Sequence, residues 1–167
     1  AGHFLLYLLL ASGLGAETEA NSVDHRAILE KLDDSAFSRG QAIYDNLCIN
    51  CHGGDGKTPT LPIARAFGKG ELKFGTDPYS MFLTLTKGNG LMGPQTWMTP
   101  QERYDVIHYV REKFMKPMHP KHVPVTEKYL AGLPTVNAAA VVTRQVERDF
   151  GPALASQLGR DLSSVLT

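Results

Sequence analysis

Two cysteines and a histidine fall within five consecutive residues of this 167-residue chain, in the order Cys48-Ile49-Asn50-Cys51-His52, and the chain has no other cysteine. Two thiols three positions apart on a helical turn face the same side. Both can therefore bond to one edge of a flat ligand, and the histidine that follows can reach a metal at its centre. This C-x-x-C-H pattern is the attachment sequence for c-type haem.

Three other uses of a cysteine pair remain open at this point. A zinc site needs four ligands, and because there is no second pair, histidines from elsewhere would have to complete it. A thioredoxin-like redox pair belongs to a βαβ pattern, which does not surround this motif. A structural disulfide would suit an exported protein. The pattern favours haem, with Cys48 and Cys51 as attachment points and His52 as the proximal iron ligand.

Helical patterns lie on both sides of the motif. Residues 34–47 carry an apolar stripe, and Ser35 is a plausible N-cap. Residues 77–87 predict a second helix, with Asp77 as its N-cap and Pro78 in its first turn. The motif therefore comes at the end of one helix and well before the next.

The clearest helix covers residues 99–116. Thr99 is its expected N-cap, Pro100 occupies the first helical position, and Glu102 completes a capping box. Pro117 is expected to stop it. Two further helices are expected at 136–149 and 152–166.

The segment from Ser35 to Lys116 resembles class I cytochromes c. Gly40, Tyr44 and Cys48 recur at intervals of four, and Tyr109 lies in the last helix of that segment (DVIHYV). The resemblance implies an all-α fold of three to five short helices around one covalently bound haem c per chain, followed by a C-terminal helical extension. It also implies that the first and last helices of the domain cross closely at Gly40, with an aromatic beside the crossing.

The same resemblance places the second axial ligand in a late loop. Met92 lies in a Gly-rich loop (GNGLMGP) seven residues before Thr99, and this spacing is similar to that of the family's axial methionine. Met98 is the runner-up and otherwise occupies an apolar core position. Gly93 stands where the family usually has proline, with Pro94 one residue later, so the loop departs from the family pattern.

Two further contacts are implied. In the family a proline carbonyl accepts the Nδ1–H of the proximal histidine, which makes Pro62 the expected partner of His52 and Pro59 the runner-up. Trp97 is expected near the haem propionates.

His/Met ligation predicts an electron carrier rather than an enzyme, because it closes both axial positions. The alternative is a haem-based sensor or small-ligand enzyme with a weak or open sixth position. Lys plus Arg and Asp plus Glu each number 17, which gives no support to nucleic acid as a partner. The haem domain carries a mild basic excess, and Lys57, Arg65, Lys69 and Lys73 cluster after the motif. They predict an acidic redox donor or acceptor.

The chain is predicted to divide into four parts. Residues 1–20 form a signal peptide or leader, 21–34 a lead-in helix or linker, 35–118 the haem domain, and 119–167 a Pro-rich strap with a helical extension. The apolar stretch Phe4–Ala16 is short for a membrane span and indicates export, which predicts a bacterial periplasmic location. A leucine stripe after residue 152 predicts packing on another domain or subunit, as in cytochrome modules joined to larger periplasmic proteins.

Overall fold

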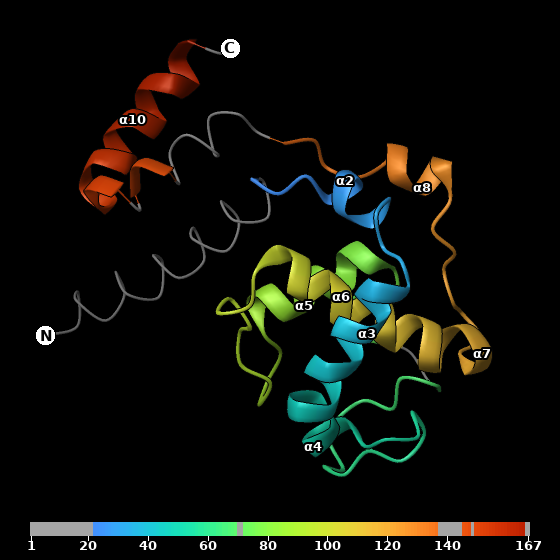
Figure 1. Cartoon of the computed structure of the whole chain (residues 1–167). Helices are drawn as coiled ribbons and strands as arrows, with labels where there is room; N and C mark the ends of the chain where they lie inside the picture. The colour runs from blue at the N-terminus through green and yellow to red at the C-terminus, as the bar shows by residue number, and fades with distance from the viewer. Residues whose placement is uncertain (1–21, 70–71, 137–144, 148, 166–167) are drawn as a thin grey trace, which may run out of the picture. The chain divides into compact units, whose positions relative to one another are not determined.

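The computed structural model describes residues 22–69, 72–136, 145–147 and 149–165 (Figure 1). Within them the regular structure is helical, and the only extended pairing is an isolated bridge between Asn89 and Met92. The expected all-α fold is confirmed. One compact unit spans His25–Leu133, and helix α10 (Pro152–Val165) belongs to a separate unit.

The helix that carries the motif is longer than the sequence predicted. Helix α3 (Asp34–Ile43) continues through a π-helical turn, Tyr44–Cys48, into α4 (Ile49–His52). The Cys-x-x-Cys-His segment is therefore itself helical, and both cysteines lie on consecutive turns of one continuous rod.

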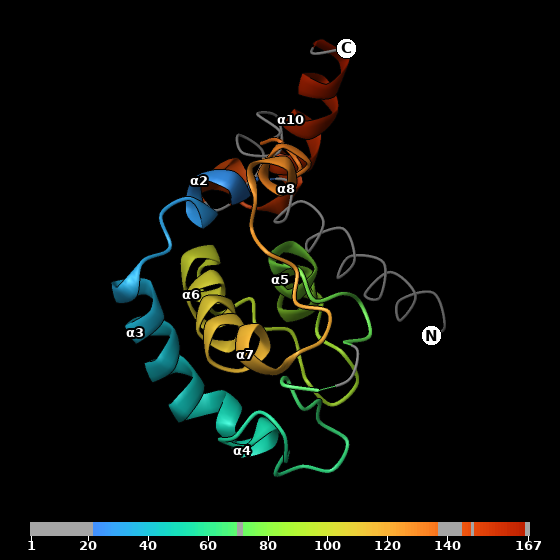
Figure 2. The same cartoon turned by 90° about the vertical axis from the view of Figure 1, so that its right-hand side faces the viewer.

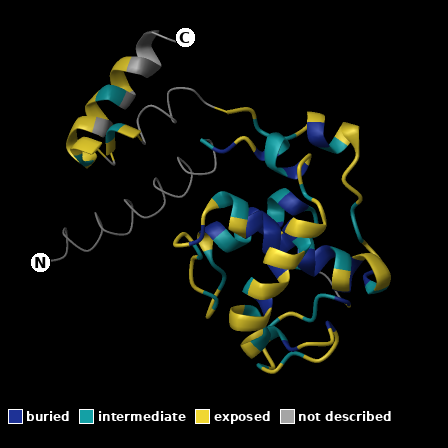
Figure 3. Ribbon diagram, in the orientation of Figure 1, coloured by how far each residue is buried: buried dark blue, intermediate teal, exposed yellow. Residues whose placement is uncertain are grey.

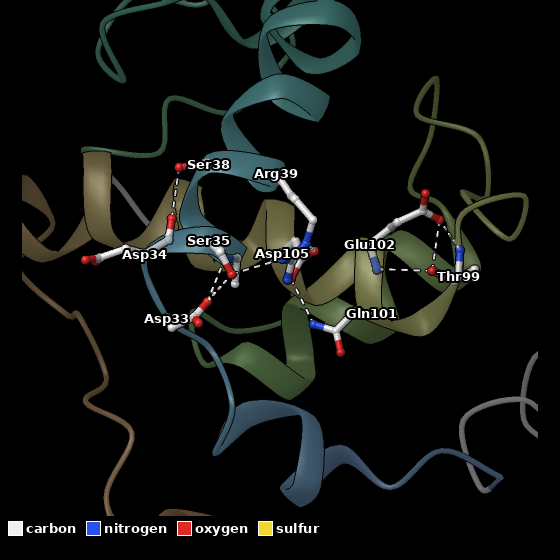
Figure 4. Close-up of polar contacts among 10 residues, drawn as sticks. Asp33, Asp34, Ser35, Ser38, Arg39, Thr99, Gln101, Glu102 and Asp105 are labelled. Carbon is white, nitrogen blue, oxygen red and sulfur yellow. Dashed lines mark hydrogen bonds and ion pairs between the residues drawn. The ribbon is translucent and has the colours of Figure 1, made fainter.

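The N-cap of α3 is Asp33, not Ser35. The Asp33 Oδ1 atom accepts from the Ala36 backbone N–H at 2.9 Å, and Ser35 Oγ donates to the same oxygen at 2.7 Å (Figure 4). An aspartate carboxylate reaches the third N–H of the first turn, which leaves Ser35 inside that turn.

Helix α5 (Pro78–Lys87) begins where the sequence predicted. Asp77 is its N-cap and accepts from the backbone N–H groups of Tyr79 and Ser80. Gly88 ends the helix with a φ of 74°, a backbone conformation that favours glycine.

Helix α6 (Pro100–Val110) also begins as predicted, with the capping box between Thr99 and Glu102 fully formed (Figure 4). It continues through a second π-helical turn, Arg111–Met115, into α7 (Lys116–Met118). This helix ends at Met118, one residue beyond Pro117, in agreement with the expected stop at this proline, which has no N–H to donate to the preceding turn.

The core forms where α6 lies between α3 and α5, and buried residues gather along α6 (Figures 2 and 3). The expected close crossing of α3 and α6 is confirmed. A Cβ atom at Gly40 would lie 2.0 Å from the Asp105 carbonyl oxygen and 3.0 Å from Tyr109 Cβ. The Tyr44 and Tyr109 rings meet beside the crossing, with their centroids 5.3 Å apart.

An ion pair closes the outer edge of the same crossing. Arg39 donates to both carboxylate oxygens of Asp105, at 2.6 and 3.1 Å, and Gln101 Nε2 donates to Asp105 at 2.9 Å (Figure 4). Asp105 is buried, so these three bonds replace the water that its charge has lost.

The compact unit extends beyond the expected haem domain at both ends. His25, in α2 (His25–Leu29), is buried with its Nδ1 atom 2.8 Å from the Tyr104 hydroxyl. On the other side, Tyr129 of α8 (Glu127–Ala131) donates from its hydroxyl to Asp77 Oδ1 at 2.7 Å. The strap after α7 therefore packs on the helical core.

The predicted leader, residues 1–20, lies outside the described residues, as does most of the predicted helix 136–149. Within the part of the chain that is described, no helix is both long enough and apolar enough to cross a membrane.

Candidate haem site

A cavity of about 570 Å³ opens between the motif helix, α5, α6 and the loops that follow α4 and α5. Cys48, Cys51, His52 and Met92 all line it, although Met92 is 40 residues further along the chain than His52. Met98 lines it as well. The volume falls within the ~300–1,000 Å³ that ligand sites occupy.

The cavity wall is mainly apolar. Its inner surface comes from buried side chains of the two packed helices, among them Met81 on α5 and Val106, Ile107 and Val110 on α6. At its mouth, large apolar side chains are exposed: Leu47, Ile63, Phe74 and Leu91. A contiguous exposed apolar surface of this kind marks a binding site, because covering it removes it from water.

His52 is held at two points by the loop that follows the motif. Its Nδ1 atom lies 3.0 Å from the Arg65 carbonyl oxygen, and the Phe67 ring stacks on the imidazole, with centroids 4.5 Å apart and planes 24° apart. A carbonyl oxygen only accepts, so Nδ1 carries the proton and Nε2 keeps the lone pair that a metal needs.

The acceptor predicted for His52 was Pro62, with Pro59 as runner-up, and the structure corrects that prediction. Pro62 is exposed and does not line the cavity. This stretch forms a turn, in which the Leu61 N–H donates to the Cys51 carbonyl and the Ala64 N–H donates to the Leu61 carbonyl. The chain therefore reaches His52 only at residue 65.

Tyr44 secures the end of the motif helix. Its buried hydroxyl donates to the Gly53 carbonyl oxygen at 2.7 Å, directly after His52. Gly53 has a φ of 72°, and a Cβ there would lie 2.2 Å from the Thr58 carbonyl oxygen. The helix therefore ends at His52, and the chain turns at once into the loop that carries Arg65 and Phe67.

Met92 lies in a short turn between α5 and α6. Asn89 N–H donates to the Met92 carbonyl at 2.7 Å, and Met92 N–H donates back to the Asn89 carbonyl at 3.2 Å. Gln95 N–H donates to the Leu85 carbonyl at 2.7 Å, which ties the end of the turn to α5. Backbone bonds thus define the position of Met92, whose side chain is half-buried at the cavity.

Met98 is buried and Trp97 is exposed, although the two residues are neighbours in the chain. Met98 is 3% exposed and packs in the core at the cavity wall, the apolar position that the resemblance implied. Trp97 is 64% exposed, donates from Nε1 to Gln95 Oε1 at 3.0 Å, and is not among the residues lining the cavity. The Trp97 indole therefore lies at the surface, and its contact with the haem propionates stays a prediction.

The competing uses of the cysteine pair find no support in the structure. The two cysteines form no disulfide with each other, and burial raises the pKa of the Cys48 thiol to about 11, with the neighbouring Cys51 adding to the rise. Nowhere in the described segments do three or more His, Cys, Asp or Glu side chains gather as a metal site would require.

The lining residues fit a haem. A porphyrin is flat and apolar with acidic side chains, and the wall offers an apolar interior, a thiol pair on one helical face and an imidazole with a free Nε2. Two cations, Arg65 and Lys73, line the cavity, and its described lining includes no Asp or Glu. Arg65 was expected only as part of a basic cluster and Phe67 was not expected at the site, because distance from the motif does not show which loop residues reach His52.

These helices and this cavity define a c-type haem-binding domain. The family model Cytochrome c matches residues 37–113, a little under half of the chain, and supports a class I cytochrome c domain over this segment. No curated protein and no solved structure matches the chain. Members of this family carry covalently attached haem c, so haem c is the cofactor of this domain and haem-based electron transfer is its function.

Proposed function

We propose that this domain is a single-haem electron carrier in which His52 and Met92 are the axial ligands and Cys48 and Cys51 the attachment points. One observation carries the proposal: these four side chains, from one helix and one distant turn, line the same apolar cavity. Bound haem supplies an iron that passes between the ferric and ferrous states.

This ligand set favours electron transfer over substrate chemistry. With an imidazole and a thioether both bound, no axial position is left for a substrate. The soft thioether and the apolar wall both favour the less charged ferrous site and raise its potential. The domain is therefore proposed to carry electrons and not to act as an enzyme.

Met92 is preferred to Met98 because of what surrounds each residue. Met98 directly precedes the N-cap Thr99 and is buried among core side chains. Met92 is half-buried, and its backbone alone is committed to the turn, so its thioether is available to a ligand.

Absorption spectroscopy of the ferric holoprotein tests this assignment. Methionine ligation produces a charge-transfer band in the near-red. We expect Met92→Ala to abolish this band, and Met98→Ala to keep it with reduced stability. Met81→Leu is the matched control, since Met81 also lines the cavity from α5. Loss of the band in Met98→Ala but not in Met92→Ala would overturn the assignment.

Spectroscopy of the wild-type protein also distinguishes the electron carrier from the alternative function. A wild-type protein without the band, whose ferrous form readily binds CO, would be a haem-based sensor or small-ligand enzyme with an open sixth position. A wild-type protein that shows the band and excludes CO supports the carrier.

We propose further that the partners of this domain present acidic surfaces to the cavity mouth. Lys57, Arg65, Lys69 and Lys73 are all exposed, and two of them line the cavity. Positive charge around the mouth would steer an acidic donor or acceptor to it. Electron-transfer rates with an acidic redox protein should fall as ionic strength rises, and a rate independent of salt would contradict the proposal.

Export to the periplasm is proposed from the apolar N-terminal stretch and from the family, since haem c domains in bacteria are typically extracytoplasmic. The mass of the mature holoprotein tests it, because cleavage of the leader removes the first 16–20 residues.

Packing on another domain or subunit is proposed only for residues 134–167, since residues 119–133 belong to the compact unit. Deletion of residues 134–167 should leave the haem spectrum unchanged.

A further inference from the structure

The segment Arg65–Phe67 touches the His52 imidazole in two different ways. The Arg65 carbonyl accepts its Nδ1 proton, and the Phe67 ring covers one of its faces with planes only 24° apart. The first contact acts on one atom at the edge of the ring, and the second acts on the whole plane.

A single hydrogen bond holds the imidazole at one edge and leaves some rotation about its Cβ–Cγ bond, because a carbonyl oxygen accepts from a broad range of directions. His52 is also half-buried rather than enclosed. A ring at stacking distance removes this freedom on one side, since rotation of the imidazole would drive its edge into the Phe67 face.

Phe67 is itself packed beside other aromatic rings. Its ring lies 6.5 Å from that of Phe114, nearly parallel to it, and 6.3 Å from that of Tyr44. The next residue is fixed as well, because Gly68 N–H donates to the Gly56 carbonyl at 2.7 Å. The packing of these aromatic rings therefore sets where the Phe67 ring lies against His52.

We propose that Phe67 is a positioning residue that sets the rotation of the His52 imidazole, and with it the direction of the proximal ligand plane across the porphyrin. The inference rests on the proposed ligation by His52. The orientation of that plane decides which porphyrin carbons share the unpaired electron of the ferric state, so it has a spectroscopic signature that packing alone does not produce.

The test compares haem-methyl hyperfine shifts in NMR spectra of the ferric holoprotein. Phe67→Leu removes the stacking face, and Phe67→Tyr keeps it. Phe37→Leu is the matched control, because it makes the same chemical change beside Tyr109 at a residue that does not line the cavity. We expect Phe67→Leu to change the order and spread of the methyl resonances, and Phe67→Tyr and Phe37→Leu to keep the wild-type pattern.

A wild-type pattern in Phe67→Leu, or an equal change in Phe37→Leu, would overturn the inference. If Phe67→Leu holds no haem, Phe67→Met replaces it, and failure of both would indicate a role in building the cavity and overturn the inference too. Failure of the proposed function shows separately, because the wild-type ferric protein would then lack the near-red band.

Discussion

The two sides of the haem cavity are built in different ways. The side of His52 is the end of one continuous helical rod, pinned to α6 at Gly40 and closed by the Tyr44 hydroxyl on the Gly53 carbonyl. The side of Met92 is a short turn, held by a backbone bridge to Asn89 and a single tie to α5.

Because of this difference, substitutions on the two sides should change different properties. Those on the His52 side should change the stability of the whole domain, and those in the turn should change the position of the Met92 thioether. Changes on the His52 side disturb the helix crossing on which the whole core depends. Changes in the turn alter few side-chain contacts, so they should move the thioether while the rest of the domain stays folded. The four predictions that follow test that separation in order of decreasing effect.

Gly40→Ala should have the largest effect. The new Cβ would lie 2.0 Å from a backbone carbonyl of α6, which cannot swing aside, so the two helices must part. We expect a loss of ~3 kcal/mol or more in the free energy of unfolding, measured by denaturant titration of the holoprotein. Gly54→Ala is the control, because its Cβ would meet only Ile49 Cδ1 at 3.6 Å. Equal stability of the two variants would contradict the rigid crossing.

Asp105→Asn should cost about 2 kcal/mol on the same side of the cavity. The variant keeps the shape but loses the charge that pairs with Arg39, and Arg39 then turns to solvent. The hydrogen bond to Asp105 also raises the pKa of Arg39 above its ordinary value. Chemical unfolding measures the loss, and the near-red band should persist in the folded fraction.

Gly88→Ala should cost about 1–2 kcal/mol, since alanine is strained at a φ of 74°. Its Cβ would also lie 2.7 Å from the Met92 carbonyl oxygen. We therefore expect a weakened near-red band in a protein that remains folded.

Two other glycines in the turn serve as matched controls for this effect. Gly90 shares the positive φ but has open space around it, so Gly90→Ala isolates the backbone strain. Gly93 has neither constraint, and Gly93→Ala should keep the band. A band that survives in Gly88→Ala would show that the turn does not position the thioether.

Tyr129→Phe should have the smallest effect, about 1 kcal/mol at neutral pH, from loss of the hydrogen bond to Asp77. Burial would raise the pKa of Asp77, but hydrogen bonds from Ser80 and Tyr129 outweigh it and lower the pKa below its ordinary value of 3.8. The unfolded state then binds more protons, so this stabilisation is present above pH 4 and declines as pH falls further.

Thermal unfolding across pH 3–7 checks this prediction. The wild type should lose stability more steeply than Tyr129→Phe below about pH 4, because part of the Asp77 stabilisation is already missing in the variant. Parallel curves for the two proteins would show that Tyr129 does not contribute to the lowered pKa.

Local signals predicted the elements well and the loop contacts poorly. Asp77, Thr99 and Glu102 cap their helices as predicted, because a cap depends only on residues within one turn. The Pro62 prediction was wrong, because the carbonyl that reaches His52 depends on how tightly the intervening loop turns. The direction of Trp97 likewise depends on the conformation of a loop, and its contact with the propionates stays a prediction.

The sequence indicated the haem chemistry, because thiol spacing acts through helical periodicity, which is a property of consecutive residues. The helix crossing at Gly40 was implied by the resemblance to class I cytochromes c. Only the tertiary structure decided that Arg65 and Phe67 hold His52, that Met92 shares its cavity, and that the strap around Tyr129 belongs to the core. These contacts join residues far apart in the chain, and their positions follow from loop closure and packing, which spacing does not encode.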